Sequence, residues 1–311
     1  MNVLVTGGAG FIGSHLIEKI EGKGNNITVV DNGSTGNIMR MKNYDINLIC
    51  QDVCDRKIVK KMVAIKPDII VHLAAQTLVD ASIKDPVFDA YENIMGTLNV
   101  LEVARQCGAR VIFASTAAAY GDVVEDDLPV LESQALSPQS FYGLTKVGVE
   151  KYLALYHQHY SLNYVVCRFA NVYGERQGDN GEGGVISIFA KRIAAGKGIT
   201  IYGDGTQTRD FVYAGDVAQG IYKAMLTENV NTVYNLSSQT ETSLLELVQI
   251  MGKVSGRDIV PNFRPVRDGD IYRSMLSNQK AKEDLDWEPK VALADGLQRT
   301  MEYFMRIDKD A

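Results

Sequence analysis

The sequence has no cluster of basic residues. Its 32 lysines and arginines are scattered among 38 aspartates and glutamates, which gives a net charge of −6 and a pI near 5.4. Surfaces that bind nucleic acids or anionic membranes concentrate positive charge on one face or segment. The sequence therefore predicts no nucleic-acid or membrane partner, and it favours a small-molecule ligand.

Cysteines are few and widely spaced. Cys50, Cys54, Cys107 and Cys167 include no CxxC pair and are accompanied by no cluster of histidines. Structural zinc sites and disulfide frameworks both need such groupings. We therefore expect reduced thiols and no metal site.

Long apolar runs are also missing. No stretch of about 18 apolar residues occurs, so no transmembrane helix is predicted. The first residues lack the basic start and apolar core of a signal peptide, and we expect a cytoplasmic protein. The 311 residues, 46% of them hydrophobic, are enough for a sizeable core in one large domain or in a large and a small one.

The first half of the chain alternates short β-branched runs with helical patterns. Strands are predicted at 2–6, 27–31, 46–50, 69–72, 111–114 and 164–168, and helices at 11–21, 55–65, 87–107 and 142–159. Such alternation is typical of parallel strands joined by crossover helices and covered on both faces. The predicted fold class is α/β, a doubly wound parallel sheet (Rossmann), which binds ligands at the carboxyl ends of its strands.

The pattern changes after residue 168. A glycine-rich stretch at 174–184 precedes predicted helices at 185–196 and 216–226, a turn at 202–205, a strand at 233–236 and a closing helix at 292–305. This mixture predicts a smaller, mixed α/β C-terminal domain. We assign residues 1–168 and roughly 211–239 to the larger domain, and residues 169–210 and 240–311 to the smaller one.

A glycine-rich turn follows the first predicted strand. Gly7, Gly10 and Gly13 stand between a strand and a helix, where missing side chains let backbone amides approach a pyrophosphate. Asp31 ends the second strand about 20 residues later, where a carboxylate can accept hydrogen bonds from ribose hydroxyls and repels a 2′-phosphate. A glycine triad alone could be a tight structural turn, but this context predicts a dinucleotide site that prefers NAD to NADP.

Two further segments end at the same edge of the predicted sheet. Asp52 and Val53 follow the third strand, where they could contact an adenine, although Asp52 could also simply cap the next helix. Leu73, Ala74 and Ala75 follow the fourth strand. Their small side chains leave room either for a cofactor or for close packing of a helix.

Tyr142 and Lys146 are four residues apart in a helical pattern, so both project from one helix face. An ammonium beside a phenol favours the phenolate and lowers its pKa from about 10, which makes a base usable near neutral pH. Ser115 and Thr116 end the fifth predicted strand, and a hydroxyl there could share a proton with Tyr142. The same hydroxyls could instead satisfy backbone groups of a turn.

These residues and their surroundings resemble a known family, the extended short-chain dehydrogenases/reductases. Within it, the chain is similar to the NAD-dependent nucleotide-sugar epimerases of the UDP-galactose 4-epimerase type. The likeness runs from residue 1 to about residue 304 through the motifs TGGAGFIG, HLAA, STAAAYG, YGLTK, RFANVYG and TRDFVY. It implies that the larger domain binds NAD and the smaller one a UDP-sugar.

The resemblance also implies residue roles. Tyr142 is the catalytic base and acid, Lys146 its electrostatic partner, and Thr116 the hydroxyl that binds the sugar O4. The expected NAD-binding residues are Gly7, Gly10, Phe11, Ile12, Gly13, Asp31, Asn32, Asp52, Val53, Leu73, Ala74, Ala75, Asn93, Ser115, Tyr142, Lys146 and Phe169. The expected substrate-binding residues are Thr116, Asn171, Val185, Tyr202, Arg209, Arg267 and Ser274.

The family reaction inverts the C4 hydroxyl of a UDP-hexose. A base removes the hydroxyl proton while hydride passes to NAD, and the 4-keto sugar turns over before hydride returns to its other face. Related 4,6-dehydratases carry an Asp and a Glu directly after the Thr, where this chain has Ala117 and Ala118. Elimination is therefore disfavoured, because alanines transfer no protons.

The sequence leaves the sugar open between glucose/galactose, their N-acetyl forms and the uronic acids. Ser274 stands where strict glucose/galactose epimerases have a bulky Tyr, and Asp268 replaces a Pro that commonly follows the position of Arg267. A non-catalytic NAD-sensing protein on the same scaffold is the alternative from another functional class. The resemblance further implies a homodimer formed through helices such as 87–107 and 142–159.

Overall fold

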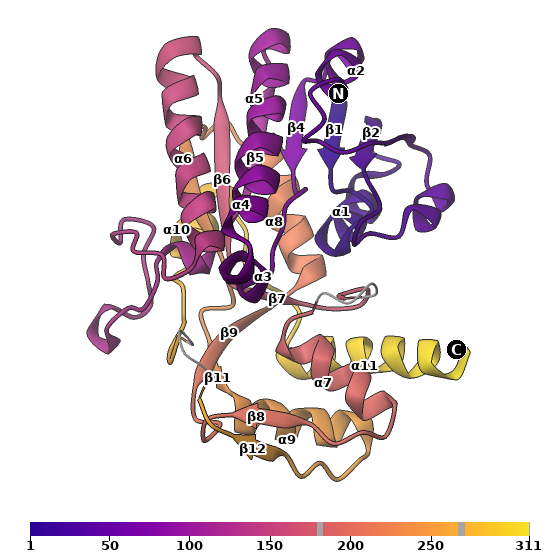
Figure 1. The fold of residues 1–311 in the computed structure, drawn as a ribbon, viewed down its shortest axis with the longest axis vertical. Helices are drawn as coiled ribbons and strands as arrows, with labels where there is room; N and C mark the ends of the chain where they lie inside the picture. Colours follow the sequence, from indigo (N-terminus) through magenta and orange to yellow (C-terminus); the bar gives the residue numbers. More distant parts are fainter. Residues whose placement is uncertain (179–182, 267–270, 311) are drawn as a thin grey trace.

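The computed structural model describes residues 1–178, 183–266 and 271–310 and contains a seven-stranded parallel sheet (Figure 1). Its strands are β1 (Asn2–Thr6), β2 (Asn26–Asp31), β3 (Asn47–Cys50), β4 (Ile69–His72), β5 (Arg110–Thr116), β6 (Tyr164–Phe169) and β10 (Thr232–Leu236). They lie in the order β10-β6-β5-β4-β1-β2-β3. The direction of strand addition reverses between β1 and β4, so a crevice forms there at the carboxyl ends of the strands.

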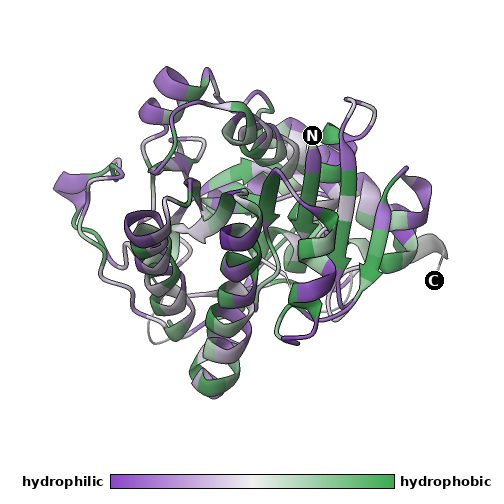
Figure 2. Ribbon diagram, turned by 90° about the horizontal axis from the view of Figure 1, so that it is seen from above, coloured by the Kyte–Doolittle hydropathy of each residue, from purple (hydrophilic) through white to green (hydrophobic). Residues whose placement is uncertain are grey.

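Helices cover both faces of this sheet. On one face lie α1 (Phe11–Ile20), α8 (Ala214–Leu226) and α10 (Gln279–Leu285), and on the other lie α2 (Ile58–Ile65), α5 (Gly96–Cys107) and α6 (Phe141–Tyr160). In Figure 2 the strands are largely green between helices that carry purple stretches. The sheet is thus the buried middle layer, as the continuous apolar runs of its strands predicted.

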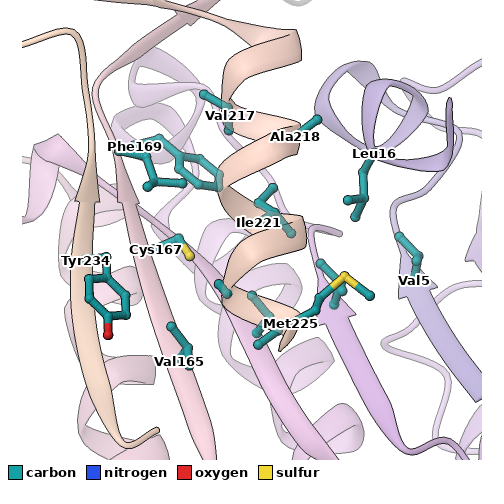
Figure 3. Close-up of a cluster of buried hydrophobic side chains, with 14 of the residues drawn as sticks. Val5, Leu16, Val165, Cys167, Phe169, Val217, Ala218, Ile221, Met225 and Tyr234 are labelled. Carbon is teal, nitrogen blue, oxygen red and sulfur yellow. The ribbon is translucent and has the colours of Figure 1, made fainter. Parts of the chain in front are cut away.

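Side chains of successive strand residues enter two different cores. Val3 and Val5 pack with α1 and α8, whereas Leu4 packs with α2 and α5. Figure 3 shows the first of these cores, where Ile221 and Met225 of α8 face the strands. Because side chains of a strand alternate in direction, a strand buried on both faces is apolar at most of its positions.

The C-terminal region has its own small sheets and core. It contains β7 (Asn171–Tyr173), β9 (Thr208–Tyr213) and β11 (Glu241–Ser243) in one sheet, and β8 (Thr200–Tyr202) with β12 (Asn262–Arg264) in another. Helices α7 (Val185–Ala194), α9 (Leu244–Ser255) and α11 (Leu293–Asp310) enclose an apolar cluster that includes Phe189, Leu247 and Met301. The predicted mixed α/β region is therefore present.

The helix predicted at 87–107 is interrupted. It begins as α4 (Pro86–Ala90), passes through a π-helical turn η2 (Tyr91–Met95), and continues as α5. A π turn adds one residue to the helix, and the apolar periodicity of the sequence does not reveal it. A short helix α3 (Val79–Lys84) precedes it and was not predicted.

The described residues also form three short 3-10 turns: η1 (Ile38–Asn43), η3 (Ala117–Ala119) and η4 (Glu125–Asp127). No helix among the described residues is long and apolar enough to cross a membrane.

Strand β9 spans the predicted domain boundary at residues 210 and 211. We propose that residues 1–168 with 211–239 form the cofactor-binding part of the molecule. Residues 169–210 with 240–311 then form the substrate-binding part.

Candidate active site

A cleft of about 620 Å³ opens at the carboxyl ends of the central strands and extends to the C-terminal region. Its size is typical of sites that bind cofactors and small substrates. Of the residues predicted to bind cofactor or substrate, twenty line it: Gly7, Gly10, Phe11, Ile12, Gly13, Asp31, Asn32, Asp52, Val53, Leu73, Ala74, Ala75, Ser115, Thr116, Tyr142, Lys146, Phe169, Asn171, Arg209 and Ser274.

The glycine turn allows three segments to meet closely. Gly7 has a φ of +71°, and a Cβ there would lie 2.6 Å from the backbone nitrogen of Ala74. At Gly13 a Cβ would lie 2.2 Å from the carbonyl oxygen of Gly7. Gly10 is the N-cap of α1 and offers no capping side chain, so the N-terminal amides of that helix remain available for an anion.

The Asp31 carboxylate is buried beside this turn. It accepts hydrogen bonds from the backbone nitrogens of Ala9 at 2.9 Å and Gly33 at 2.8 Å. Burial raises the pKa of Asp31, and these two hydrogen bonds oppose the increase. The carboxylate is thereby fixed at the end of β2, and its remaining lone pairs can accept hydrogen bonds from ribose hydroxyls.

Helix α6 brings Tyr142 and Lys146 into the cleft. Ser140 caps the helix by accepting a hydrogen bond from the backbone nitrogen of Gly143 at 3.1 Å, which fixes the turn that carries Tyr142. The Lys146 Nζ lies 5.9 Å from the centre of the Tyr142 ring. Burial lowers the pKa of Lys146 to about 8, although the charges of Asp89 and Glu150 act in the opposite direction.

The end of β5 lies against this helix. The Thr116 hydroxyl lines the cleft and accepts a hydrogen bond from the backbone nitrogen of Ala118 at 3.1 Å, so it is aimed by the turn that follows. The Ser115 hydroxyl donates to Glu150 at 2.6 Å. Both hydroxyls therefore have structural contacts, and Thr116 and Tyr142 both line the cleft.

A buried polar network behind Ser115 was not predicted. Glu150 forms a bidentate ion pair with Arg168, with Nη2 at 2.6 Å and Nε at 3.0 Å from its two oxygens. Arg168 also donates to the Tyr120 hydroxyl at 2.8 Å, which donates to Asn235 at 2.7 Å. Glu150 follows Lys146 by four residues, so the helical spacing that linked Tyr142 to Lys146 could have indicated it.

Three predicted binding residues lie outside the cleft lining, and a fourth is not among the described residues. Asn93 does not line the cleft, because its amide is turned toward the buried side chains of Asp89 and Thr145. Val185 begins α7 and Tyr202 ends β8, and neither lines the cleft. Arg267 lies outside the described residues.

The C-terminal region contributes Asn171, Arg209 and Ser274 to the cleft wall. Arg209 is on β9 directly before Asp210, whose carboxylate accepts hydrogen bonds from the Ser238 hydroxyl at 2.7 Å and the backbone nitrogen of Leu276 at 3.2 Å. These bonds join the strand of Arg209 to the segment that carries Ser274.

One group of possible metal ligands occurs in the described residues: Asp52, Cys54 and Glu92. Asp52 already accepts hydrogen bonds from Asn32 at 2.9 Å and from the backbone nitrogen of Cys54 at 2.7 Å. Burial raises the pKa of the Cys54 thiol far above its usual range, which keeps it neutral and a poor metal ligand. Asp52 and Cys54 are better explained as part of the loop after β3, and Glu92 as a residue of η2.

Residues 3–237 match the model of the NAD dependent epimerase/dehydratase family. A putative UDP-glucose 4-epimerase of Methanocaldococcus jannaschii is 38% identical over 97% of both chains. The crystal structure of a Thermotoga maritima UDP-glucose 4-epimerase with UDP-glucose is 40% identical, with a TM-score of 0.95 over 99% of both chains. A Thermus thermophilus UDP-glucose 4-epimerase in complex with NAD is 37% identical, with a TM-score of 0.91 over 98% of this chain and 99% of that one. This chain belongs to the NAD dependent epimerase/dehydratase family.

Proposed function

We propose that this protein is an NAD-dependent isomerase that inverts the C4 hydroxyl of a UDP-hexose through a transient 4-keto sugar. The observation that carries the proposal is that Tyr142, Lys146 and Thr116 line one cleft with the glycine turn of β1 and α1. The similar enzymes from Thermotoga maritima and Thermus thermophilus, which bind UDP-glucose and NAD respectively, support it.

The residues at the sheet edge fit NAD. The open N-terminus of α1 suits a pyrophosphate, and the fixed Asp31 carboxylate suits an unphosphorylated ribose. When bound, NAD supplies the acceptor and donor of the C4 hydride. The epimerisation consumes no net reductant, because the hydride that leaves C4 returns to it.

Side chains of the protein transfer the C4 hydroxyl proton and stabilise the charges that form. Tyr142 as phenolate removes the C4 hydroxyl proton and later returns it, while Thr116 holds the same oxygen. Lys146 stabilises the phenolate through its positive charge. Arg209 is suited to the diphosphate, because a guanidinium forms strong paired hydrogen bonds to phosphate oxygens.

Two related reactions are less well supported by the cleft. Ala117 and Ala118 line it directly after Thr116, so no acid or base stands there to expel a C6 hydroxyl as water. Among the described lining residues, Lys146 and Arg209 are the basic ones, and both have roles already. We therefore favour a neutral hexose over a uronic acid, whose C6 carboxylate would bind most strongly to a further cation.

The test is to offer the purified protein a panel of UDP-hexoses, N-acetyl-hexoses and uronic acids without added NAD. We expect a neutral UDP-hexose to be inverted at C4, and proton NMR detects the change of configuration. Tyr142→Phe should abolish turnover while retaining the bound cofactor and the nucleotide. A product lighter by one water in the mass spectrum would contradict the proposal, and so would full biological output from Tyr142→Phe, which favours an NAD sensor.

The proposed assembly is a homodimer formed through α4, η2 and α6. Large apolar side chains are exposed there, including Val87 at 77%, Leu144 at 53% and Tyr91 at 50%. Contiguous apolar patches mark interfaces. Light scattering should give twice the chain mass for the wild type and the monomer mass for Leu144→Glu, whereas Val260→Glu, an exposed position just before β12 in the C-terminal region, should stay dimeric. The cytoplasmic location stays a prediction.

A further inference from the structure

A second buried carboxylate, on the helix segment that precedes the π turn, accepts a hydrogen bond from Thr145, the residue directly before Lys146. Asp89 in α4 is fully buried, with no exposed side-chain surface. Its Oδ1 accepts hydrogen bonds from Gln76 at 2.6 Å and Asn93 at 3.1 Å, and its Oδ2 lies 3.0 Å from the Thr145 hydroxyl. All three partners can donate, which is the arrangement that an ionised carboxylate requires.

These hydrogen bonds join three pieces of the cleft. Gln76 belongs to the segment after β4 that forms one wall, and its backbone nitrogen donates to Asn93 at 2.9 Å. Thr145 directly precedes Lys146, and its hydroxyl can also donate to the Tyr142 carbonyl oxygen at 2.9 Å. Asp89 therefore ties α4, which packs against α6, to the turn of α6 between Tyr142 and Lys146.

Two carboxylates belong to the groups around Lys146, and one of them forms no ion pair with an arginine. From its own helix the groups are Tyr142 and Glu150, and Glu150 is held in the bidentate ion pair with Arg168 of β6. From β4 comes His72, which burial and the Lys146 charge keep neutral, with a pKa of about 3. From α4 comes Asp89, which hydrogen-bonds to neutral groups only.

We propose that Asp89 is a positioning residue, the counter-ion that keeps Lys146 as an ammonium and holds its turn of α6 against the cleft. The ammonium is otherwise costly, because a buried charge without an opposite charge loses its hydration. Of the two carboxylates that favour the charged form of Lys146, Asp89 is the one without a guanidinium of its own. The catalytic role of Lys146 rests on the proposed function. Its charge state can be measured whether or not that function is correct.

The test measures the pH midpoint at which Lys146 loses its proton. It uses NMR of isotope-labelled lysine in the protein as isolated. The signal is identified by its absence in Lys146→Met. Asp89→Asn removes the charge and keeps the size and hydrogen-bonding capacity of the side chain. We expect it to move the Lys146 midpoint down by roughly one pH unit, the effect of losing a nearby opposite charge. The alkaline limb of kcat should move in the same direction with little change in KM.

Thr145→Val is the matched control, because it removes a hydrogen bond to Asp89 and leaves the charge. Its Lys146 midpoint should equal that of the wild type. An unchanged midpoint in Asp89→Asn would overturn the counter-ion role. If that variant does not fold, Asp89→Glu replaces it, because it displaces the carboxylate and should change the Lys146 midpoint; no change there would equally overturn the counter-ion role. Failure of the wild type to interconvert UDP-hexoses would instead overturn the proposed function and leave this titration valid.

Discussion

The Nζ of Lys146 donates a hydrogen bond to the carbonyl oxygen of Ala114 across 3.0 Å. This bond joins the reactive face of α6 to the end of β5, directly before Ser115 and Thr116. A flexible lysine is thereby held in one place beneath the Tyr142 ring. Tyr142, the proposed base, is on α6, and the Thr116 hydroxyl is at the end of β5. The buried Lys146 ammonium connects these two elements.

Activity should therefore depend on the protonation of Lys146. Its pKa is lowered to about 8, so the ammonium is present below that pH and is lost as pH rises through it. We expect kcat to fall on the alkaline side of about pH 8, and Lys146→Met to lose roughly 10²-fold or more of the rate. Lys151→Met, an exposed lysine on the same helix, should keep the wild-type profile. An alkaline limb that survives in Lys146→Met would show that another group titrates.

The glycine turn offers a matched pair of substitutions. Gly7 and Gly22 have nearly equal φ values of +71° and +70°, but a Cβ meets the backbone of Ala74 only at Gly7 and meets nothing within 4 Å at Gly22. Gly22→Ala should cost about 1 to 2 kcal/mol of conformational strain and retain NAD. Gly7→Ala should in addition lose the bound cofactor, measured by absorbance of the purified protein. Equal NAD content in both variants would argue against a cofactor at this turn.

The ion pair between Glu150 and Arg168 should be important for stability. Both side chains are buried, and removal of one partner leaves an uncompensated charge that typically costs about 3 to 5 kcal/mol. Glu150→Gln should lower the free energy of unfolding by roughly that amount in urea denaturation. Arg105→Gln breaks the exposed pair with Glu102 and should leave the midpoint nearly unchanged. Similar midpoints for both variants would contradict this prediction.

The sequence predicts those parts of the molecule whose cause is local. The strands of the central sheet were predicted from their apolar runs, and the turn at Gly7, Gly10 and Gly13 from residue types that only such a turn requires. Helical spacing predicts that Tyr142 and Lys146 share one face of a helix, whereas their catalytic roles came from the family resemblance. Each of these patterns lies within a few residues of chain, and the structure places all of them as expected.

The remainder depends on contacts between distant segments. Glu150 meets Ser115 and Arg168 only after β5, β6 and α6 have assembled. Asn93 was predicted to bind the cofactor; its side-chain amide hydrogen-bonds to Asp89, Gln76 and Thr145 in the structure, and its binding role stays a prediction. Neither the extra residue of the π turn η2 nor a partner about 50 positions away leaves a periodic signal in the sequence.

Ser274 provides the test of substrate size. It lines the cleft on the segment that Asp210 holds through the backbone of Leu276, so its position is fixed rather than loose. If the hexose lies beside it, a small side chain leaves space for an N-acetyl group at C2, and a larger one fills that space. Ser274→Tyr should therefore reduce turnover of the UDP-N-acetyl-hexoses far more than that of UDP-glucose and UDP-galactose. Steric exclusion costs more free energy than a missing contact. We therefore expect kcat/KM for the UDP-N-acetyl-hexoses to fall tenfold or more, which corresponds to about 1.4 kcal/mol or above.

The control for this prediction is Ser274→Ala, which removes the hydroxyl and keeps the space. It should leave the ratio of the two activities close to that of the wild type, since any hydrogen bond from Ser274 adds little to discrimination by size. If Ser274→Tyr lowers both activities equally, Ser274 contacts the nucleotide or the diphosphate instead of C2. If it changes neither, the hexose binds nearer to Thr116 and away from this wall, and the choice of sugar is made by residues on the β5 side of the cleft.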